Sequence, residues 1–238
     1  MVAQYPMDVL GWPGGKLTLP INNAQEIIQP TLNNYASEWF YLNAAKDGVV
    51  FAVQSGPGDS TIGSKYRRAE WREMTPDGSA RAAWDGRTGY HALEIEVSVD
   101  ALPGTVKRHT VFCQIHDPDA DISVGRIEGS KNDPNTATLW ITKRSNSHGY
   151  KLTDHYQLGT RFRFGFVVRD GKIGYTYNGQ PVDYTLPAEF GEAYFKFGNY
   201  VQTLEEGLAS VTIYRVNLCH DEQRYGSLAA GRAADSVE

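Results

Sequence analysis

The sequence predicts an all-β protein, a sandwich or jelly roll of antiparallel sheets in one domain. Short runs of alternating apolar and polar residues recur along the chain between turn residues, with no long helical period. Aromatic residues make up 12% of the 238 residues and glycine occurs 24 times, a composition typical of strands joined by tight turns. No repeat or linker divides the chain, so we expect residues 1–238 to form a single domain.

Strand patterns follow one another along the chain. The expected strands are residues 16–20, a pair within 38–53, 66–74, 91–99, 110–116, 136–143, 161–169, 172–177, 194–202 and 210–218. Asp170-Gly171 and Asn178-Gly179 are strong hairpin signals on either side of residues 172–177. Antiparallel neighbours are therefore expected on both sides of that strand.

The segments between these strands are expected to be irregular. Residues 22–35 predict a loop with a helical turn, and residues 54–65 and 117–135, with their turn residues, predict loops that could cover a groove. A helical turn is expected at residues 187–190 and a loose tail at residues 227–238.

Charge and hydropathy exclude some classes of function. The net charge of −5 argues against a general nucleic-acid or membrane-surface protein, although a local basic strip is compatible with a polyanionic ligand. No apolar run approaches the roughly 20 residues of a membrane span. Met1 to Leu10 lacks the charged and apolar regions of a signal peptide, which leaves a cytosolic protein or a mature form with an added Met1.

The two cysteines, Cys113 and Cys219, permit one disulfide without requiring it. Cys113 alternates with Val111 and Ile115, which favours a small buried apolar side chain over a disulfide. The sequence contains no CxxC or HExxH motif, so we expect no metal site and no cofactor.

Three expected strands each carry polar functional residues on one face and apolar residues on the other. The polar faces hold Arg68, Glu70 and Arg72; Gln114 and His116; and Tyr194, Lys196, Gly198, Tyr200 and Gln202. Ala69, Trp71, Ile115, Phe195 and Phe197 lie on the opposite faces. If the three strands share one sheet, guanidinium, ammonium, amide, imidazole and phenol groups converge on one groove.

This set of groups suits β-elimination on a uronic acid polymer. The substrate carboxylate must be neutralised before the C5 proton leaves, and arginine and amide donors do this with charge-assisted bonds. A base near C5 and an acid near O4 complete the step, and His and Tyr can fill these roles. Each segment alone is more typical of an ordinary solvated strand, so the interpretation depends on their joint appearance.

The three segments resemble motifs of polysaccharide lyase family 7, the jelly-roll alginate lyases. Arg-[Ser/Thr]-Glu-Leu-Arg is similar to residues 68–72, Gln-[Ile/Val]-His to residues 114–116, and Tyr-Phe-Lys-Ala-Gly-x-Tyr-x-Gln to residues 194–202. Together with the opening strand, the resemblance covers about residues 10–218. It implies a single catalytic lyase domain with a concave groove, a monomeric secreted protein in its mature form, and alginate as the anionic polysaccharide partner, with no nucleic acid or membrane.

The resemblance also implies residue roles. Arg68 and Gln114 would neutralise the substrate carboxylate, and His116 would act as base or assist neutralisation, depending on the C5 configuration. Tyr200 would protonate O4, and in a syn elimination would also be the base. The groove would be shaped and charged by further substrate-binding residues, namely Glu70, Arg72, Lys196 and Gln202, with Tyr194 structural or in contact with substrate.

The sequence departs from the family pattern on the apolar faces. Ala69 replaces Ser or Thr, Trp71 replaces Leu and Phe197 replaces Ala, and the last two are expected to be matched core changes. Ile115, the middle residue of Gln-Ile-His, is associated in the family with guluronate-containing substrates and is a weak indication here.

Three alternatives stay open at this point. A jelly-roll β-glucanase needs Glu-x-Asp-x-x-Glu, and the segment from Glu94 ends with Val99 where the second carboxylate should stand. A carbohydrate-binding module would use tryptophan platforms, for which the candidates are Trp12, Trp39, Trp84 and Trp140. The third alternative is a lyase for another uronan, such as glucuronan. Endo-acting cleavage of alginate to 4,5-unsaturated oligosaccharides is the favoured prediction.

Overall fold

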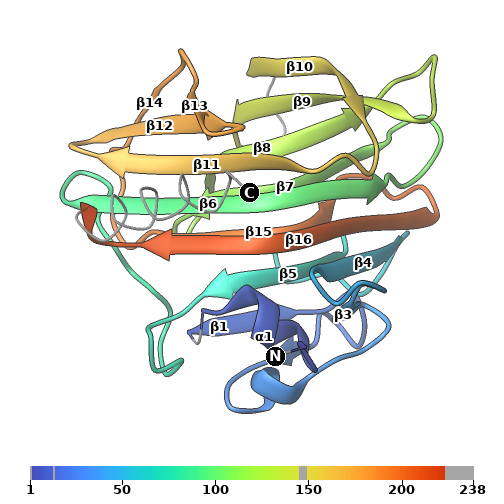
Figure 1. Cartoon of the computed structure of the whole chain (residues 1–238), viewed down its shortest axis with the longest axis horizontal. Helices are drawn as coiled ribbons and strands as arrows, with labels where there is room; N and C mark the ends of the chain where they lie inside the picture. Colours follow the sequence, from blue (N-terminus) through green and yellow to red (C-terminus); the bar gives the residue numbers. More distant parts are fainter. Residues whose placement is uncertain (1, 13, 145–148, 223–238) are drawn as a thin grey trace.

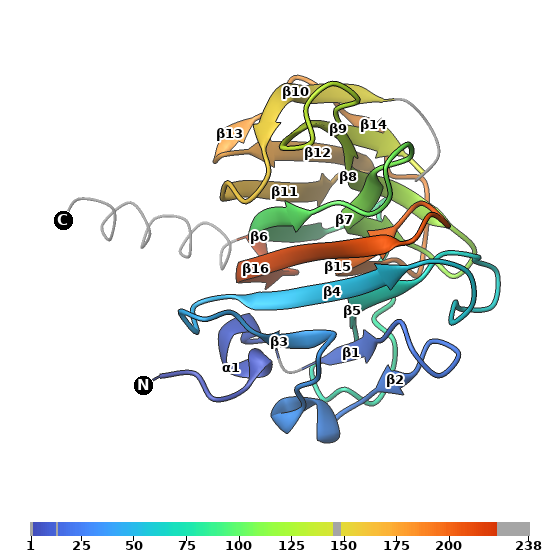
Figure 2. The ribbon, with the colours of Figure 1, turned by 90° about the vertical axis from the view of Figure 1, so that its right-hand side faces the viewer.

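The computed structural model describes residues 2–12, 14–144 and 149–222, which form two antiparallel β-sheets packed face to face (Figures 1 and 2). The sheet that we call the site sheet contains, in spatial order, β10 (Tyr150–Gln157), β9 (Thr136–Lys143), β8 (Asp121–Gly129), β7 (His109–His116), β15 (Tyr194–Val201), β5 (Arg68–Glu73), β1 (Gly15–Thr18) and β2 (Glu26–Ile27). The predicted all-β sandwich of two antiparallel sheets is confirmed.

The second sheet, which we call the back sheet, packs behind the first. It contains β13 (Gln180–Pro181), β12 (Lys172–Tyr177), β11 (Phe162–Arg169), β6 (Tyr90–Ala101), β16 (Gly207–Cys219), β4 (Val49–Ser55) and β3 (Phe40–Leu42), while β14 (Leu186–Pro187) pairs with β12. The short helix α1 (Pro6–Leu10) lies near the N-terminal end of the chain beside β3 (Figure 1), and the 3-10 helix η1 comprises Thr31–Asn34.

Aromatic side chains fill the space between the sheets. Phe112 of the site sheet meets Phe162 and Phe164 of the back sheet edge to face, with ring centroids 5.5 and 5.3 Å apart. Phe195 stacks on Phe166 of the back sheet, with ring centroids 6.4 Å apart. Burial of each such ring contributes about 1.5–3 kcal/mol, so these contacts hold the site sheet firmly against its support.

The hairpin between β11 and β12 forms as the sequence predicts. Asp170 and Gly171 have φ values of 49° and 74°, the positive values that a type I′ turn requires at both central residues. Asn178 and Gly179, with 50° and 77°, turn the chain again after β12. The turn residues therefore fix this edge of the back sheet.

The prediction of a loop at residues 117–135 is wrong, because the central part of this segment is strand β8. Val124 and Ile127 are fully buried, whereas Gly125 and Arg126 interrupt their alternation in the sequence. A side chain at Gly125 would lie 2.7 Å from the Phe112 ring, so close packing explains the glycine. Pairing with β7 and β9 on both sides satisfies the backbone of this polar segment.

Three smaller features also differ from the expectations. The helical turn expected at residues 187–190 is absent: Leu186 and Pro187 form β14, and the N–H of Ala188 donates to the carbonyl of Gly171 at 2.7 Å. Strand β10 and helix α1 were not predicted. The tail expected at residues 227–238 lies outside the described residues.

Both cysteines are buried and free, which confirms the interpretation of Cys113 as a small apolar side chain. Burial raises the pKa of the Cys113 thiol well above its ordinary value, so this side chain stays neutral. Within the three described ranges, no helix is long and apolar enough to cross a membrane.

Candidate active site

The three polar strand faces lie side by side in the site sheet, where β15 is paired with β7 on one side and β5 on the other (Figure 1). Lys196 stands opposite Gln114 of β7 and Arg72 of β5. Tyr194 stands opposite His116, and Tyr200 opposite Arg68. The predicted convergence of these residues on one sheet is confirmed.

Glu70 is the centre of a buried ionic cluster beneath this surface. Its carboxylate pairs with the ammonium of Lys196 and with the guanidinium of Arg68, the latter at 3.3 Å, and it accepts a hydrogen bond from the Gln114 amide. The side chains of Glu70 and Lys196 are only 2% and 9% exposed. Glu70 therefore orients Arg68, Lys196 and Gln114 and compensates the charge of the two cations.

Burial and charge act in opposite directions on this cluster. Burial disfavours the charged form of Glu70, but the charges of Lys196 and Arg68 prevail and lower the pKa of its carboxyl. Burial, opposed by Glu70, lowers the pKa of Lys196 to about 8. At neutral pH the site thus has three cationic side chains, including Arg72, around one carboxylate, which suits an anionic ligand.

His116 is oriented by contacts to its Nδ1 atom. Its Nδ1 contacts the carbonyl oxygen of Asp117, and because a carbonyl only accepts, Nδ1 carries a hydrogen. In the neutral imidazole, Nε2 then holds the lone pair. Burial, together with the charge of Lys196, lowers the pKa of the imidazole. The Tyr194 ring stacks on it at 5.3 Å, with its hydroxyl 3.0 Å from Nδ1. The imidazole is therefore oriented, and its lowered pKa favours the neutral form that a general base requires.

Tyr194 itself is suited to a structural role. Burial raises the pKa of its phenol, despite the opposing charges of Arg72 and Arg81. Its hydroxyl also lies 3.3 Å from the carbonyl oxygen of Asp117. A phenol that keeps its proton and lies against the His116 ring positions that ring.

Tyr200 lies in the pocket of the site sheet. The guanidinium of Arg68 is 3.8 Å from the centre of its ring, and its hydroxyl is 2.9 Å from Oγ of Ser64. The pocket has a volume of about 640 Å³ and is lined by Gly63, Ser64, Lys65, Tyr66, Asp121, Tyr200 and Gln202. Of the predicted site residues, Tyr200 and Gln202 thus line the pocket directly, and Arg68 contacts Tyr200.

Sequence reasoning missed most of the pocket's wall. Ser64 and Lys65 come from the loop expected at residues 54–65, whose sequence gave no indication of which side chains face the groove, and Tyr66 was assigned to the strand that follows. Asp121 was hidden in the segment predicted to be a loop. None of these residues belongs to a motif, so only the fold brings them to Tyr200.

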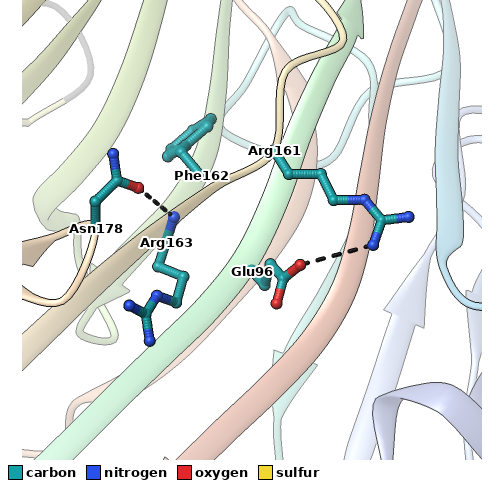
Figure 3. Close-up of a pocket in the computed structure, with 5 residues that line it drawn as sticks. All are labelled: Glu96, Arg161, Phe162, Arg163 and Asn178. Atoms are coloured by element: carbon teal, nitrogen blue, oxygen red, sulfur yellow. Dashed lines mark hydrogen bonds and ion pairs between the residues drawn. The ribbon is translucent and has the colours of Figure 1, made fainter. Parts of the chain in front are cut away.

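A second pocket, of about 250 Å³, lies on the back sheet (Figure 3). Its Arg161 pairs with Glu96 at 3.7 Å and with Asp47 at 2.6 Å, and stacks over the ring of Tyr214 at 3.5 Å. The N–H of Arg163 donates to the side chain of Asn178 at 3.0 Å. Because these partners already satisfy Arg161, this pocket is a weaker candidate for a catalytic site.

The residues proposed as tryptophan platforms are mostly packed into the fold. Trp84 is buried and stacks on His91 at 4.5 Å, and Trp12 and Trp39 pack against the core. Trp140, on β9, has the ammonium of Lys151 at 5.9 Å from its ring.

In the described part of the chain, no group of three His, Cys, Asp or Glu residues could hold a metal ion.

The family model described as alginate lyase matches residues 15–220. The chain belongs to the alginate lyase family. Alginate lyase AlgAT5 of polysaccharide lyase family 7 is 38% identical to it, with 92% of this chain and 100% of that chain covered and a TM-score of 0.84. The alginate lyase from Corynebacterium sp. is 35% identical, with 93% and 100% covered and a TM-score of 0.84. The resemblance to polysaccharide lyase family 7 is confirmed.

A third solved structure agrees in fold alone. It is a variant of alginate lyase A1-II' in complex with the substrate GGMG, 23% identical, with 92% of this chain and 97% of that chain covered and a TM-score of 0.74. No curated protein matches the sequence.

The departures from the family motifs fit one another in this family member. Trp71 and Phe197, on neighbouring strands, stack with ring centroids 4.6 Å apart and planes inclined by 16°. Gly15 of β1 leaves room for the indole, because a side chain there would lie 2.0 Å from its Nε1 atom. Both rings are fully buried on the face away from the pocket, so they alter the core rather than the site.

Proposed function

We propose that this protein is an endo-acting alginate lyase that cleaves 1,4-linked uronate chains by β-elimination at the cluster around Tyr200. The observation that carries the proposal is the buried Arg68–Glu70–Lys196–Gln114 cluster, which stands beside a tyrosine in an open pocket. Membership in the alginate lyase family supports a lyase over a non-catalytic binding module. The oligosaccharide GGMG bound to A1-II' supports alginate as the ligand.

The first step is neutralisation of the substrate carboxylate at C5. Arg68 and the Gln114 amide donate to it, and the charge of Lys196 lies close behind them. Negative charge moves from C5 into this carboxylate in the transition state, so these bonds strengthen as the reaction proceeds. Glu70 holds the donors in place without contacting the sugar.

The elimination itself transfers one proton to the enzyme and one to the leaving group. A base removes the C5 proton, the electron pair forms the C4–C5 double bond, and the C4–O4 bond breaks. Tyr200 gives its proton to O4, which leaves as the hydroxyl of the released chain. No water enters the products, which distinguishes this reaction from hydrolysis.

The identity of the base depends on the sugar. In mannuronate the C5 proton and O4 lie on the same side, so the Tyr200 phenolate can act as base and then return the proton to O4. In guluronate, the C5 epimer, they lie on opposite sides and a second group must act as base. Nε2 of the neutral His116 is the group available for this role.

The direct test is absorbance of the C4–C5 unsaturated uronate during incubation with polymannuronate, polyguluronate and mixed-block alginate. We expect the absorbance to rise, with viscosity falling early if cleavage is internal. Tyr200→Phe should lose turnover while retaining most of its affinity for the polymer. A flat trace with all three alginates, or release from glucuronan alone, contradicts the assignment to alginate.

We further propose that the protein acts as a secreted monomer without a cofactor. Alginate is a polymer too large to enter a cell intact, which supports action outside the cell. The assignments of base, acid and carboxylate donors use side chains of one chain only. Light scattering in solution tests the monomeric state, and fractionation of culture medium tests secretion.

A further inference from the structure

We propose that Ser64 is a positioning residue for the elimination, and that its hydroxyl directs the proton and the lone pairs of the Tyr200 phenol. The inference rests on the proposed role of Tyr200 as acid and base. Ser64 lies outside the three motif strands, in the segment between β4 and β5. Its Oγ is 2.9 Å from the phenolic oxygen, and both residues line the same pocket.

The backbone around Ser64 holds its hydroxyl in place. The N–H of Tyr66 donates to Oγ at 3.1 Å, and the N–H of Ser64 donates to the carbonyl of Thr61 at 3.0 Å. Arg67 fixes the start of the same segment, because its guanidinium donates to the carbonyls of Gln54, Pro57 and Gly58 at 3.1, 2.6 and 3.1 Å. The hydroxyl is therefore organised before substrate binds.

This arrangement favours Ser64 as the donor in the hydrogen bond to Tyr200. The N–H of Tyr66 already occupies a lone pair of Oγ, so the hydroxyl hydrogen of Ser64 can turn to Tyr200. Its other acceptor, the carbonyl of Tyr66, lies at 3.4 Å, near the limit of a hydrogen bond. With Ser64 as donor, the phenol's own hydrogen is free to point into the pocket, toward O4 of the sugar.

The same donor serves the deprotonated state. A phenolate accepts a charge-assisted hydrogen bond from Ser64, and the Arg68 guanidinium, 3.8 Å from the ring centre, adds a positive charge. Ser64 thus supports Tyr200 both as base and as acid without itself exchanging a proton with the substrate. Its loss should slow the chemical step more than it weakens binding.

The experiment compares Ser64→Ala and Ser64→Thr with the wild type on polymannuronate. We expect Ser64→Ala to lower kcat about tenfold or more with KM within about twofold, since charge-assisted hydrogen bonds are the strong ones. The rising limb of its kcat/KM–pH profile should move to higher pH, because the phenolate has lost a donor. Ser64→Thr, which keeps the hydroxyl, should recover most of the rate.

A matched control is Ile62→Ala, an exposed side chain in the same segment that does not line the pocket. It should leave kcat, KM and the pH profile unchanged. If Ser64→Ala leaves kcat and the kcat/KM–pH profile unchanged, or raises KM alone, the proposal is overturned. Either result would mean that Ser64 only holds the segment between β4 and β5 in place. Failure of Ser64→Thr to recover activity overturns it as well.

A thermal double-mutant cycle keeps the inference testable apart from catalysis. The change in Tm caused by Ser64→Ala should be smaller in a Tyr200→Phe background, because the phenolic partner is already missing. If the Tm changes of the two single variants simply add in the double variant, the proposed contact between Ser64 and Tyr200 is overturned. Ser64→Cys replaces Ser64→Ala in both experiments if the alanine variant does not fold. A wild type without unsaturated product contradicts the lyase proposal instead, and the cycle still reports on the contact.

Discussion

Replacing Glu70 by glutamine tests whether a buried carboxylate holds the cationic site together. The substitution keeps the shape of the side chain but removes the negative charge that faces Arg68 and Lys196. Removal of one partner of a buried ion pair costs about 3–5 kcal/mol, because the remaining charge stays desolvated. With the side chains of Glu70 and Lys196 only 2% and 9% exposed, solvent screens the pair little and this range applies.

The expected loss is large enough to measure by two methods. A change of 1 kcal/mol moves Tm by roughly 2–4 °C in a protein of this size, so Glu70→Gln should melt roughly 6–20 °C below the wild type. Urea unfolding followed by tryptophan fluorescence gives the free energy of unfolding directly. The control is Asp154→Asn, which removes a half-exposed pair with Lys151 at 2.9 Å and should lower Tm far less than Glu70→Gln, because solvent screens an exposed pair.

The pH dependence of stability provides a second readout for Glu70. Burial opposes its charge, but Lys196 and Arg68 keep the pKa of the folded carboxyl below its ordinary value of 4.5. Its stabilisation is therefore present above pH 4.5 and is lost as pH falls through the lower folded value. Glu70→Gln should therefore lose less unfolding free energy than the wild type as the pH falls through this range. A variant as stable as Asp154→Asn, with the wild-type acid profile, would refute the argument.

Three further predictions concern titratable groups. Burial lowers the pKa of Lys196 to about 8, so KM for polymannuronate should rise between pH 7 and 9, and Lys196→Arg should flatten the rise unless another group causes it. His116→Asn should lose cleavage of polyguluronate far more than of polymannuronate; equal losses would exclude it as the guluronate base. Burial and the charge of His220 lower the pKa of His91, so the unfolded chain binds more protons and stability falls as pH drops through 6.5. His91→Phe, which can still stack on Trp84, should lose less unfolding free energy between pH 7 and 5, and an unchanged loss would contradict this origin.

The sequence predicted those parts of the fold and site that depend on local pattern. Alternation along β11 and the two Asp-Gly and Asn-Gly turns specify a hairpin without help from the rest of the chain. The polar faces of β5, β7 and β15 follow from the alternation of polar and apolar residues along each strand. The reaction that their side chains could perform together suggested that the three strands are neighbours in one sheet. Their adjacency was an inference from function, which pairing of Lys196 with both Gln114 and Arg72 bears out.

Other parts depend on contacts between distant segments, which periodicity does not report. Strand β8 looked like a loop because the packing of Phe112 requires a glycine at Gly125, which breaks its apolar alternation. Ser64 is 136 residues from Tyr200 in the chain, and no spacing rule joins them. Glu70 could be assigned to the site, but its burial beneath the donors follows from three strands closing around it.

The difference between the two tyrosines of β15 shows why the backbone must be considered with the pattern. The register against β7 shifts between Phe197 and Tyr200, where β15 carries an extra residue. Gly198 adopts φ 131°, and a side chain there would meet the carbonyl of Ala69 at 2.6 Å, so this bulge requires glycine. Asn199 turns inward and its amide donates to the carbonyl of Phe51 on the back sheet at 3.0 Å.

The bulge separates the surroundings of the two phenols. Before it, Tyr194 is buried against His116 and keeps its proton, whereas after it Tyr200 emerges into the pocket beside Arg68. Bulges often re-aim side chains next to active sites, and this one is fixed to the opposite sheet by Asn199. The proposed assignment of Tyr200, and not Tyr194, as the reactive phenol therefore depends on the surroundings of each ring and not on residue type.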